Sequence, residues 1–212
     1  MQKEELYQKI SQLKVVPVIV IDDLDSAVPL ANALIEGGMS IIEITFRTDV
    51  AAQAIKVICK EYPRLIVGAG TVLTIDNLKM AQDSGAQFAV APGLNPGIVE
   101  ESIKLDIPFM PGVMTPSDIE QALHYNLKVL KFFPAEASGG INYFKSVITP
   151  YMHMGIKYIP LGGININNFG EYLKLDTVIA IGGTWLAKKQ DIAANNWQQI
   201  TQNCRELLSK MK

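Results

Sequence analysis

The chain has 212 residues, 49% of them hydrophobic and 19% charged, which is the composition of a globular protein with enough length for one sizeable core. Its formal net charge of -2 and isoelectric point near 5.7 provide no basic surface for nucleic acid, and two histidines with two cysteines exclude a rich metal cluster. Without a signal peptide or an apolar stretch near the roughly 18 residues that span a bilayer, we expect a cytoplasmic protein with no membrane partner.

The predicted elements begin with an amphipathic N-terminal helix over Glu4–Leu13. After it, short apolar runs rich in Val and Ile alternate with segments that have the apolar spacing of helices. One of these helices is predicted over Asp25–Glu36, with Asp25 or Ser26 as its N-cap. The apolar runs predict eight strands, at Val15–Ile21, Ser40–Phe46, Leu65–Gly68, Phe88–Ala91, Ile107–Met110, Lys128–Phe133, Lys157–Pro160 and Val178–Ile181. A C-terminal helix over Trp197–Met211 ends the series.

The order of these elements indicates the fold class. The strands recur about every 20 to 28 residues, which fits βα units that each consist of a strand, a turn and a crossover helix. We therefore expect an α/β fold with one domain over residues 1–212, a (β/α)8 TIM barrel to which the N-terminal and C-terminal helices are additions. An open, doubly wound sheet is the alternative, but no Gly-x-Gly-x-x-Gly turn follows the first strand.

The second predicted strand carries charged side chains on one face. The two-residue period of a strand separates the mixed set Ile41, Glu43, Thr45 and Arg47 from the apolar set Ile42, Ile44 and Phe46. We expect the mixed face to look into the barrel, whose active site lies at the carboxyl ends of the strands. Glu43 lies deeper and is suited to proton transfer, whereas Arg47 lies nearer the mouth, where its guanidinium can hold a carboxylate. The alternative is an ion pair between Glu43 and Arg47 at the barrel mouth, in which each side chain only neutralises the charge of the other.

The sixth predicted strand contains a lysine in an apolar setting. Lys131 lies within the run VLKFFP at 129–134, where a buried strand is expected. Desolvation in a barrel interior disfavours an ammonium group, and a neutral amine can attack a ketone to form a Schiff base. Phe133 and Pro134 would then form the apolar side of the pocket. The alternative is a lysine that extends from the strand end into water.

Three other strand ends are rich in small residues. The third strand ends in GAGT at 68–71, where glycine lets the backbone approach a ligand and Thr71 provides a hydroxyl. The last two strands end in Gly162-Gly163 and Gly182-Gly183, and Thr184 follows the second pair. Loops after these two strands commonly form a phosphate site in barrel enzymes. The pattern indicates a ligand with a phosphate at one end and, near Arg47 and Thr71, a carboxylate at the other.

Taken together, these motifs resemble the family of 2-keto-3-deoxy-6-phosphogluconate (KDPG) aldolases, which also cleave 4-hydroxy-2-oxoglutarate (KHG). The resemblance covers nearly the whole chain, through VVPVIVID at 15–22, EITFRT at 43–48, VGAGTVL at 67–73, APGLNP at 91–96, LKFFPAEASGG at 130–140, PLGGI at 160–164 and IGGTWL at 181–186. It implies that Lys131 is the Schiff-base lysine, that Glu43 is the general acid/base, and that Arg47 and Thr71 bind the substrate carboxylate. It further implies a phosphate site formed by Gly162, Gly163, Gly183 and Thr184. The rest of the substrate would be bound by Pro92, Phe133 and Leu161.

The resemblance also implies an activity and an assembly. A class I aldolase of this family uses no metal or organic cofactor and forms a homotrimer. It would cleave KDPG to pyruvate and glyceraldehyde 3-phosphate, and KHG to pyruvate and glyoxylate. His124 and His153 have no companion histidine at ligand spacing, which disfavours a metal-dependent aldolase. A phosphosugar isomerase or epimerase, or a phosphosugar-binding barrel without catalysis, would share the phosphate loops and leave Lys131 without a covalent role.

One position departs from the family pattern. The family commonly reads Pro-Thr-Gly-Gly where this chain reads PLGG at 160–163. Leu161 lacks a hydroxyl that could hydrogen-bond a substrate hydroxyl, so we expect weaker selectivity for the gluco over the galacto epimer at carbon 4. An aldolase for 2-keto-3-deoxy-6-phosphogalactonate is therefore the alternative substrate assignment.

Overall fold

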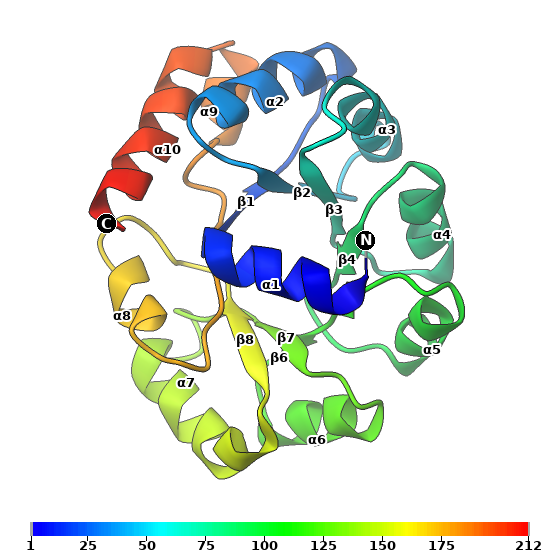
Figure 1. Ribbon diagram of the computed structural model, residues 1–212, viewed down its shortest axis with the longest axis vertical. Coiled ribbons are helices and arrows are strands. Elements are labelled where there is room, and N and C mark those ends of the chain that lie inside the picture. The colour runs from blue at the N-terminus through cyan, green and yellow to red at the C-terminus, as the bar shows by residue number, and fades with distance from the viewer. Residues whose placement is uncertain (1, 212) are drawn as a thin grey trace. The chain divides into compact units, whose positions relative to one another are not determined.

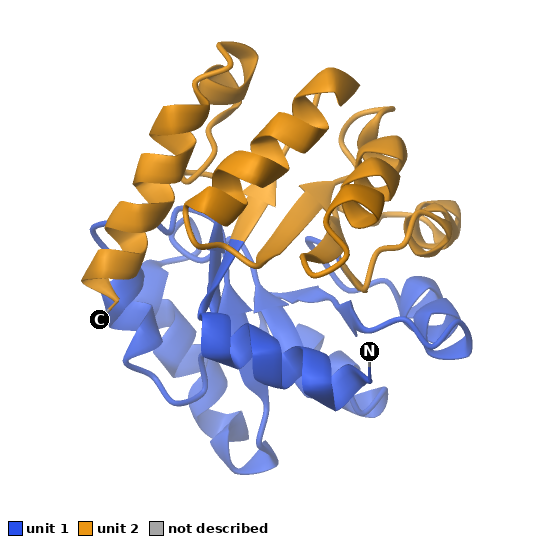
Figure 2. Cartoon of the chain, turned by 45° about the horizontal axis from the view of Figure 1, so that its top comes forward, with its two compact units in different colours: residues 1–16, 90–183 blue, residues 17–89, 184–212 orange. Residues whose placement is uncertain are grey.

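The computed structural model describes residues 2–211 and is an α/β fold in which parallel strands alternate with helices (Figure 1). The chain divides into two compact units. Unit 1 consists of Met1–Val16 and Val90–Gly183, and unit 2 consists of Pro17–Ala89 and Thr184–Lys212 (Figure 2). None of the helices in the described part of the chain has the length and apolar content needed to span a bilayer.

Unit 2 is built on short parallel strands in the order β1–β2–β3–β4. It contains β2 Ile41–Thr45, β3 Ile66–Gly70, and most of β1 Val15–Ile19 and β4 Phe88–Val90. Every residue of the first three strands is buried, as expected for parallel strands covered on both faces. The register pairs Glu43 with Val18 on one side and with Gly68 on the other, so Glu43 lies on a strand with neighbours on both edges.

The helices of unit 2 cover these strands with apolar stripes. Their bounds are η1 Leu24–Ser26, α2 Ala27–Glu36, α3 Ala51–Glu61, α4 Ile75–Asp83, α9 Lys189–Ala193 and α10 Trp197–Lys210. The C-terminal helix α10, predicted within one residue of its observed end, lies alongside α2 (Figure 1). The Thr201 hydroxyl donates to the Ala33 carbonyl at 2.9 Å, and a Cβ on Gly37 would lie only 2.5 Å from Cys204 Cβ. Glycine at position 37 therefore allows the close approach of the two helices.

Unit 1 contains a parallel sheet in the order β6–β7–β8. Its strands are β6 Gly112–Val113, β7 Val129–Phe132 and β8 Lys157–Pro160, and the unit also holds β5 Phe109–Met110 and β9 Ile181–Gly183. Lys131 pairs with Gly112 on one edge of β7 and with Ile159 on the other. The helices of the unit are α1 Lys3–Leu13, α5 Pro96–Lys104, α6 Pro116–His124, α7 Gly140–Ile148, η2 Thr149–Met154 and α8 Phe169–Leu173.

An aromatic cluster supports the strand that carries Lys131. The ring of Phe144 in α7 lies 4.8 Å from that of Phe132, 5.4 Å from Tyr158 and 6.1 Å from Tyr172, measured between ring centres. These are normal separations for stabilising edge-to-face and tilted aromatic pairs. Because successive strand residues point to opposite faces, Lys131 points away from the face on which Phe132 meets this cluster.

The fifth and the last predicted strands differ most from the observed ones, whereas the other six are found within two residues of their predicted bounds. Strand β5 contains only the last two residues of the fifth predicted strand, Ile107–Met110, and β6 follows beyond it, after Pro111, which has no N–H to donate. The last strand begins at Ile181 rather than at Val178, whose N–H donates to the Leu175 carbonyl in a turn at 2.8 Å. The prediction that the last strand ends in the second glycine pair is confirmed, since Gly182 and Gly183 are the last two residues of β9, although the strand continues two residues past its predicted end at Ile181.

The predicted cap of the second helix is confirmed only in position, since Ser26 is the N-cap residue of α2 but its side chain makes no capping hydrogen bond. The carboxylate of Asp23 accepts a hydrogen bond from the Asp25 N–H at 3.1 Å and caps η1, which leads into α2. Ser26 precedes α2 without a side-chain capping bond. A short 3₁₀ turn has thus taken the place of the first turn of the predicted helix, which moves the capping carboxylate toward the N-terminus.

Replacing Gly68 by alanine is expected to destabilise the fold. A Cβ at this position in β3 would lie 2.1 Å from the buried ring of Phe88, so the ring or the strand must move, which lowers the free energy of unfolding by about 1–3 kcal/mol. Urea denaturation measures this loss. The matched control is Gly170→Ala in α8, where nothing lies within 4 Å of the new Cβ and the change should be neutral or stabilising. Equal unfolding midpoints for the two variants would contradict the prediction.

Candidate active site

Lys131 is the buried amine of unit 1. Its residue is 6% exposed, so the alternative in which the side chain extends into water is wrong. The Nζ atom lies 5.3 Å from the centre of the Phe133 ring, within the range of a cation–π contact. Phe133 follows the end of β7 and shares the parity of Lys131, as predicted. The strand thus holds the amine beside an aromatic surface and away from the helix-covered face.

The backbone after β7 is bonded to the backbone after β8. The Ala135 N–H donates to the Leu161 carbonyl at 2.7 Å, and the Glu136 N–H donates to the Gly162 carbonyl at 2.9 Å. Gly162 and Gly163 have φ values of 93° and 87°, in the left-handed region that favours glycine. The predicted glycine loop is therefore fixed, through backbone bonds, to the segment that directly follows the lysine strand.

Phe133 links the glycine loop to the lysine. A Cβ on Gly162 would lie 3.1 Å from the Phe133 ring and 3.0 Å from Pro134 Cα, so this glycine packs on the aromatic residue that also faces Lys131. Within unit 1 the structure brings together the Lys131 amine, the Phe133 ring and the first of the two glycine pairs that the sequence predicts to bind phosphate.

Glu136 is a residue that the sequence analysis missed. Its carboxylate accepts a short hydrogen bond from the Tyr172 hydroxyl of α8, and a Cβ on Gly163 would lie 2.5 Å from Glu136 Cβ. Burial and the Glu136 carboxylate both raise the pKa of Tyr172, so its hydroxyl remains a donor at neutral pH. Glu136 thereby packs against the glycine loop at Gly163 and joins it to Tyr172 of α8. Its place in the run FFPAE, directly after the lysine strand, was the available sequence signal.

Leu161 is directed into the protein. The residue is 5% exposed, and a Cβ on Gly182 would lie 2.7 Å from Leu161 Cγ. The leucine therefore packs directly on the backbone of β9, one residue before Gly183. Leu161 and Gly183 are brought close to each other in unit 1, and Thr184, which is exposed, follows as the first residue of the second segment of unit 2.

Pro92 lies beside the lysine strand through its backbone. A Cβ on Gly112 would lie 2.0 Å from the Pro92 carbonyl oxygen, and Gly112 is the residue that pairs with Lys131. The Gly112 N–H also donates to the Gly93 carbonyl at 3.3 Å. A side chain at position 112 would displace this backbone, so glycine there keeps the Pro92 segment close to the sheet edge next to Lys131.

Glu43 is the buried carboxylate of unit 2. It is 2% exposed, and its Oε1 would lie 2.0 Å from a Cβ on Gly70, the last residue of β3. Only glycine leaves room there for the carboxylate. The adjacent inward hydroxyl, Thr45 Oγ1, donates to the Ile19 carbonyl at 3.0 Å and thus joins β2 to β1. The prediction that Glu43 lies deep in its strand, among apolar neighbours, is confirmed.

Arg47 reaches Thr71 from a turn and not from a strand. Strand β2 ends at Thr45, and the Arg47 N–H donates to the Thr45 carbonyl at 2.8 Å, so the predicted strand parity does not extend to Arg47. Its Nε nevertheless donates to Thr71 Oγ1 at 3.3 Å. Thr71 has a φ of 56°, which is strained for a β-branched residue and is often found at ligand sites. Arg47 and Thr71, which the sequence predicts to bind a substrate carboxylate, therefore contact each other in unit 2.

The chain is similar to known proteins over nearly its whole length. The model of the KDPG and KHG aldolase family matches residues 6–203. The 2-dehydro-3-deoxy-phosphogluconate aldolase of Haemophilus influenzae is 42% identical over 209 residues, which are 99% of this chain and 98% of that protein. The KHG/KDPG aldolase of Escherichia coli strain K12 is 41% identical over 198 residues, which are 93% of this chain and 92% of that protein. Among solved structures, the KDPG aldolase of Legionella pneumophila, with pyruvate captured at low pH as a covalent carbinolamine intermediate, has a TM-score of 0.91 and 36% identity over 98% of both chains.

Proposed function

Because the chain belongs to the KDPG and KHG aldolase family, we propose that it is a class I aldolase that cleaves KDPG to pyruvate and glyceraldehyde 3-phosphate. The observation that carries the proposal is Lys131, a buried amine in the middle of a parallel sheet and beside an aromatic ring. A lysine in such a place is suited to attack the ketone of a 2-keto acid. The carbinolamine trapped in the Legionella relative supports the same covalent chemistry.

The covalent sequence begins at Lys131. Its Nζ attacks carbon 2 of the keto acid, and the resulting carbinolamine loses its hydroxyl as water to give an iminium. Glu43 gives and takes the protons of these steps and accepts the proton of the 4-hydroxyl as the bond between carbons 3 and 4 breaks. The bonding electrons pass to the iminium, so the aldehyde leaves and an enamine of pyruvate remains. Protonation of the enamine and hydrolysis then release pyruvate and restore the amine.

The remaining predicted residues act as anchors in this proposal. Arg47 and Thr71, which already contact each other, bind the carboxylate of the substrate. Gly162, Gly163, Gly183 and Thr184 bind its phosphate through backbone N–H groups and a hydroxyl. Anchors at both ends of the substrate hold the scissile bond in position. KHG, which has a second carboxylate in place of the phosphate end, is the expected second substrate and would give pyruvate and glyoxylate.

The proposal also covers the domain organisation, the closure of the barrel and the assembly of the protein. Similarity over nearly the full length of the relatives supports one domain over residues 1–212, organised as a closed (β/α)8 barrel with an added N-terminal and C-terminal helix. It also includes a cytoplasmic homotrimer that works without metal or organic cofactor, as the family resemblance implies. Sedimentation velocity of the purified chain tests the trimer.

A direct assay tests the activity. Purified protein is incubated with KDPG, and pyruvate is followed by the oxidation of NADH with lactate dehydrogenase. We expect release of pyruvate in equal amount to glyceraldehyde 3-phosphate, and slower release from KHG. A folded protein that releases pyruvate from neither substrate would overturn the proposal and favour a phosphosugar isomerase or a binding protein.

Substitution of Leu161 is expected to change the selectivity of the protein between the gluco and galacto epimers at carbon 4 of the substrate. A Leu161→Thr variant regains a hydroxyl that can bond one epimer of the 4-hydroxyl, so its preference for KDPG over the galacto epimer should rise by about threefold to tenfold. The measurement is the ratio of kcat/KM values for the two epimers. The control is Leu161→Val, which has the shape of threonine without the hydroxyl and should keep the wild-type ratio. If the wild-type protein discriminates as well as Leu161→Thr, the prediction is wrong.

A further inference from the structure

A pocket separate from the predicted active-site residues lies in unit 2 at the amino ends of β2 and β3. It has a volume of about 370 Å³ and is lined by residues from the end of α2, the end of α3 and the segments that directly precede the two strands. Glu43, Arg47 and Thr71 belong instead to the body or the carboxyl side of the same strands. We call this space the amino-end pocket, and its volume is in the range of small-molecule sites.

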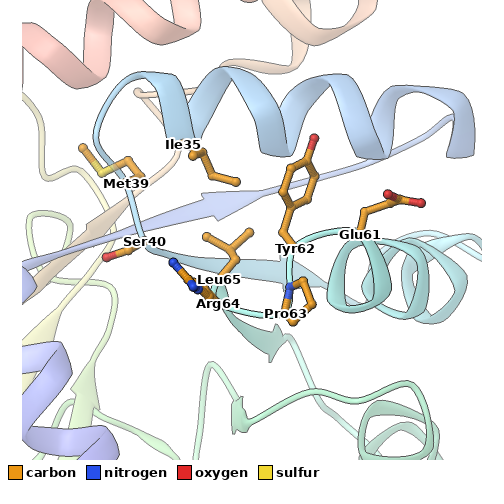
Figure 3. Close-up of a pocket in the computed structure, with 8 residues that line it drawn as sticks. All are labelled: Ile35, Met39, Ser40, Glu61, Tyr62, Pro63, Arg64 and Leu65. Carbon is orange, nitrogen blue, oxygen red and sulfur yellow. The ribbon is translucent and has the colours of Figure 1, made fainter.

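The walls of the amino-end pocket are apolar. Ile35 of α2, Met39 before β2, Tyr62 after α3 and Leu65 before β3 surround it, and Figure 3 shows their side chains around one space. Ile35 is 36% exposed, although its helix neighbours Ala33 and Leu34 are buried in the core. An apolar ligand body in the pocket would remove this surface from water, which is favourable.

The pocket is held in shape by backbone bonds. The Ile66 N–H donates to the Ser40 carbonyl at 2.9 Å, which joins the start of β3 to the residue before β2. The Leu65 N–H donates to the Tyr62 carbonyl at 2.9 Å and closes the turn after α3. A ligand would therefore meet a largely preformed site, which reduces the entropy lost on binding.

One rim of the pocket carries a cation. Arg64 and Ser40 line the pocket on one side in Figure 3, whereas the carboxylate of Glu61 lies on the opposite side. Among residues 2–211, the Arg64 guanidinium makes no hydrogen bond and no ion pair. A guanidinium offers paired N–H donors that match the two oxygens of a carboxylate, and the Ser40 hydroxyl adds a third donor.

We propose that the amino-end pocket binds a small carboxylate with an apolar body. The body packs against Ile35, Met39, Tyr62 and Leu65, and the carboxylate binds Arg64 and Ser40. A ligand with one negative charge fits better than a dianion, because Glu61 also lines the pocket, on the side opposite Arg64, and would repel the additional charge. This site is independent of the aldolase proposal, since it uses none of the residues assigned to that reaction.

Binding of 3-phenylpropionate, with 3-phenylpropan-1-ol as the uncharged comparison, tests the proposal by isothermal titration calorimetry. We expect the wild-type protein to bind the acid about threefold to tenfold more tightly than the alcohol at low ionic strength. Arg64→Gln should remove that preference and leave binding of the alcohol unchanged. Arg64→Lys should retain part of it, and Ile35→Trp, which fills the pocket from a partly exposed helix position, should weaken binding of both compounds. Saturating pyruvate should change none of these affinities.

Several outcomes would overturn the proposal. Absence of saturable binding to the wild-type protein would do so, as would an acid preference that Arg64→Gln retains. Displacement of the acid by pyruvate would assign the binding to the aldolase site instead. If Ile35→Trp changes the sedimentation coefficient of the assembly, a second copy of the chain covers the pocket. Urea denaturation of each variant checks that the fold is retained. Because Arg64 is exposed, its substitution should have little effect on the free energy of unfolding.

Discussion

Incubation of the folded protein with pyruvate and sodium borohydride is expected to leave one pyruvate-derived adduct, on Lys131. The amine forms an iminium with the ketone, and hydride converts this reversible bond into a stable secondary amine. Lys131→Ala should form no adduct and lose aldol cleavage completely, because no other group can supply the electron sink. Intact mass and peptide mass spectrometry measure the adduct, and pyruvate release measures the cleavage.

The control for this experiment is another lysine of the same segment. Lys128 directly precedes β7 but is exposed, and its Nζ donates to the Met154 carbonyl at 3.3 Å. Lys128→Ala should keep both the adduct and the activity. Since alanine at position 131 leaves a small cavity in a buried strand, unfolding by urea shows whether the variant is folded. An adduct on a different lysine, or cleavage by folded Lys131→Ala, would refute the Schiff-base assignment.

Much of the site was predictable because strands carry strong local signals. The run VLKFFP contains one lysine among apolar residues, and the structure places this residue in β7, buried and beside Phe133. Glu43 likewise stands between apolar residues of a buried strand. In both cases the alternation of neighbouring residues determines the face, so local sequence was sufficient.

Other features depend on contacts between segments distant in sequence. The turn that carries Arg47 ends the strand earlier than its apolar pattern suggests, yet the guanidinium still reaches Thr71. The shift of the last strand follows from the Ile181 N–H, which donates to the Lys14 carbonyl at 3.0 Å. Glu136 gains its role only because Tyr172 and Gly163 lie next to it in the fold. No window of sequence contains these partners, which explains why periodicity did not reveal them.

Glu43→Gln is expected to slow cleavage of KDPG by about 10²–10⁴-fold, the usual contribution of a general acid–base group. The amide has the size of the carboxyl group and fits the space beside Gly70, but it cannot accept and return a proton. Because Lys131 is retained, the variant should still form the borohydride-trapped adduct, at a lower rate. The kcat for pyruvate release and the rate of adduct formation are the two measurements.

Comparison of these two rates separates a proton-transfer role from a packing role. Glu61→Gln, an exposed glutamate of the same unit, should leave both rates at the wild-type level. Gly70→Ala offers a positional test, because the new Cβ occupies the place of Glu43 Oε1 and must displace the carboxylate without changing its chemistry. If Glu43 moves protons, Gly70→Ala should lose kcat as Glu43→Gln does while forming the same adduct. Full activity of Glu43→Gln would assign the proton transfer to another group, and Glu43 would then have only a structural role in β2.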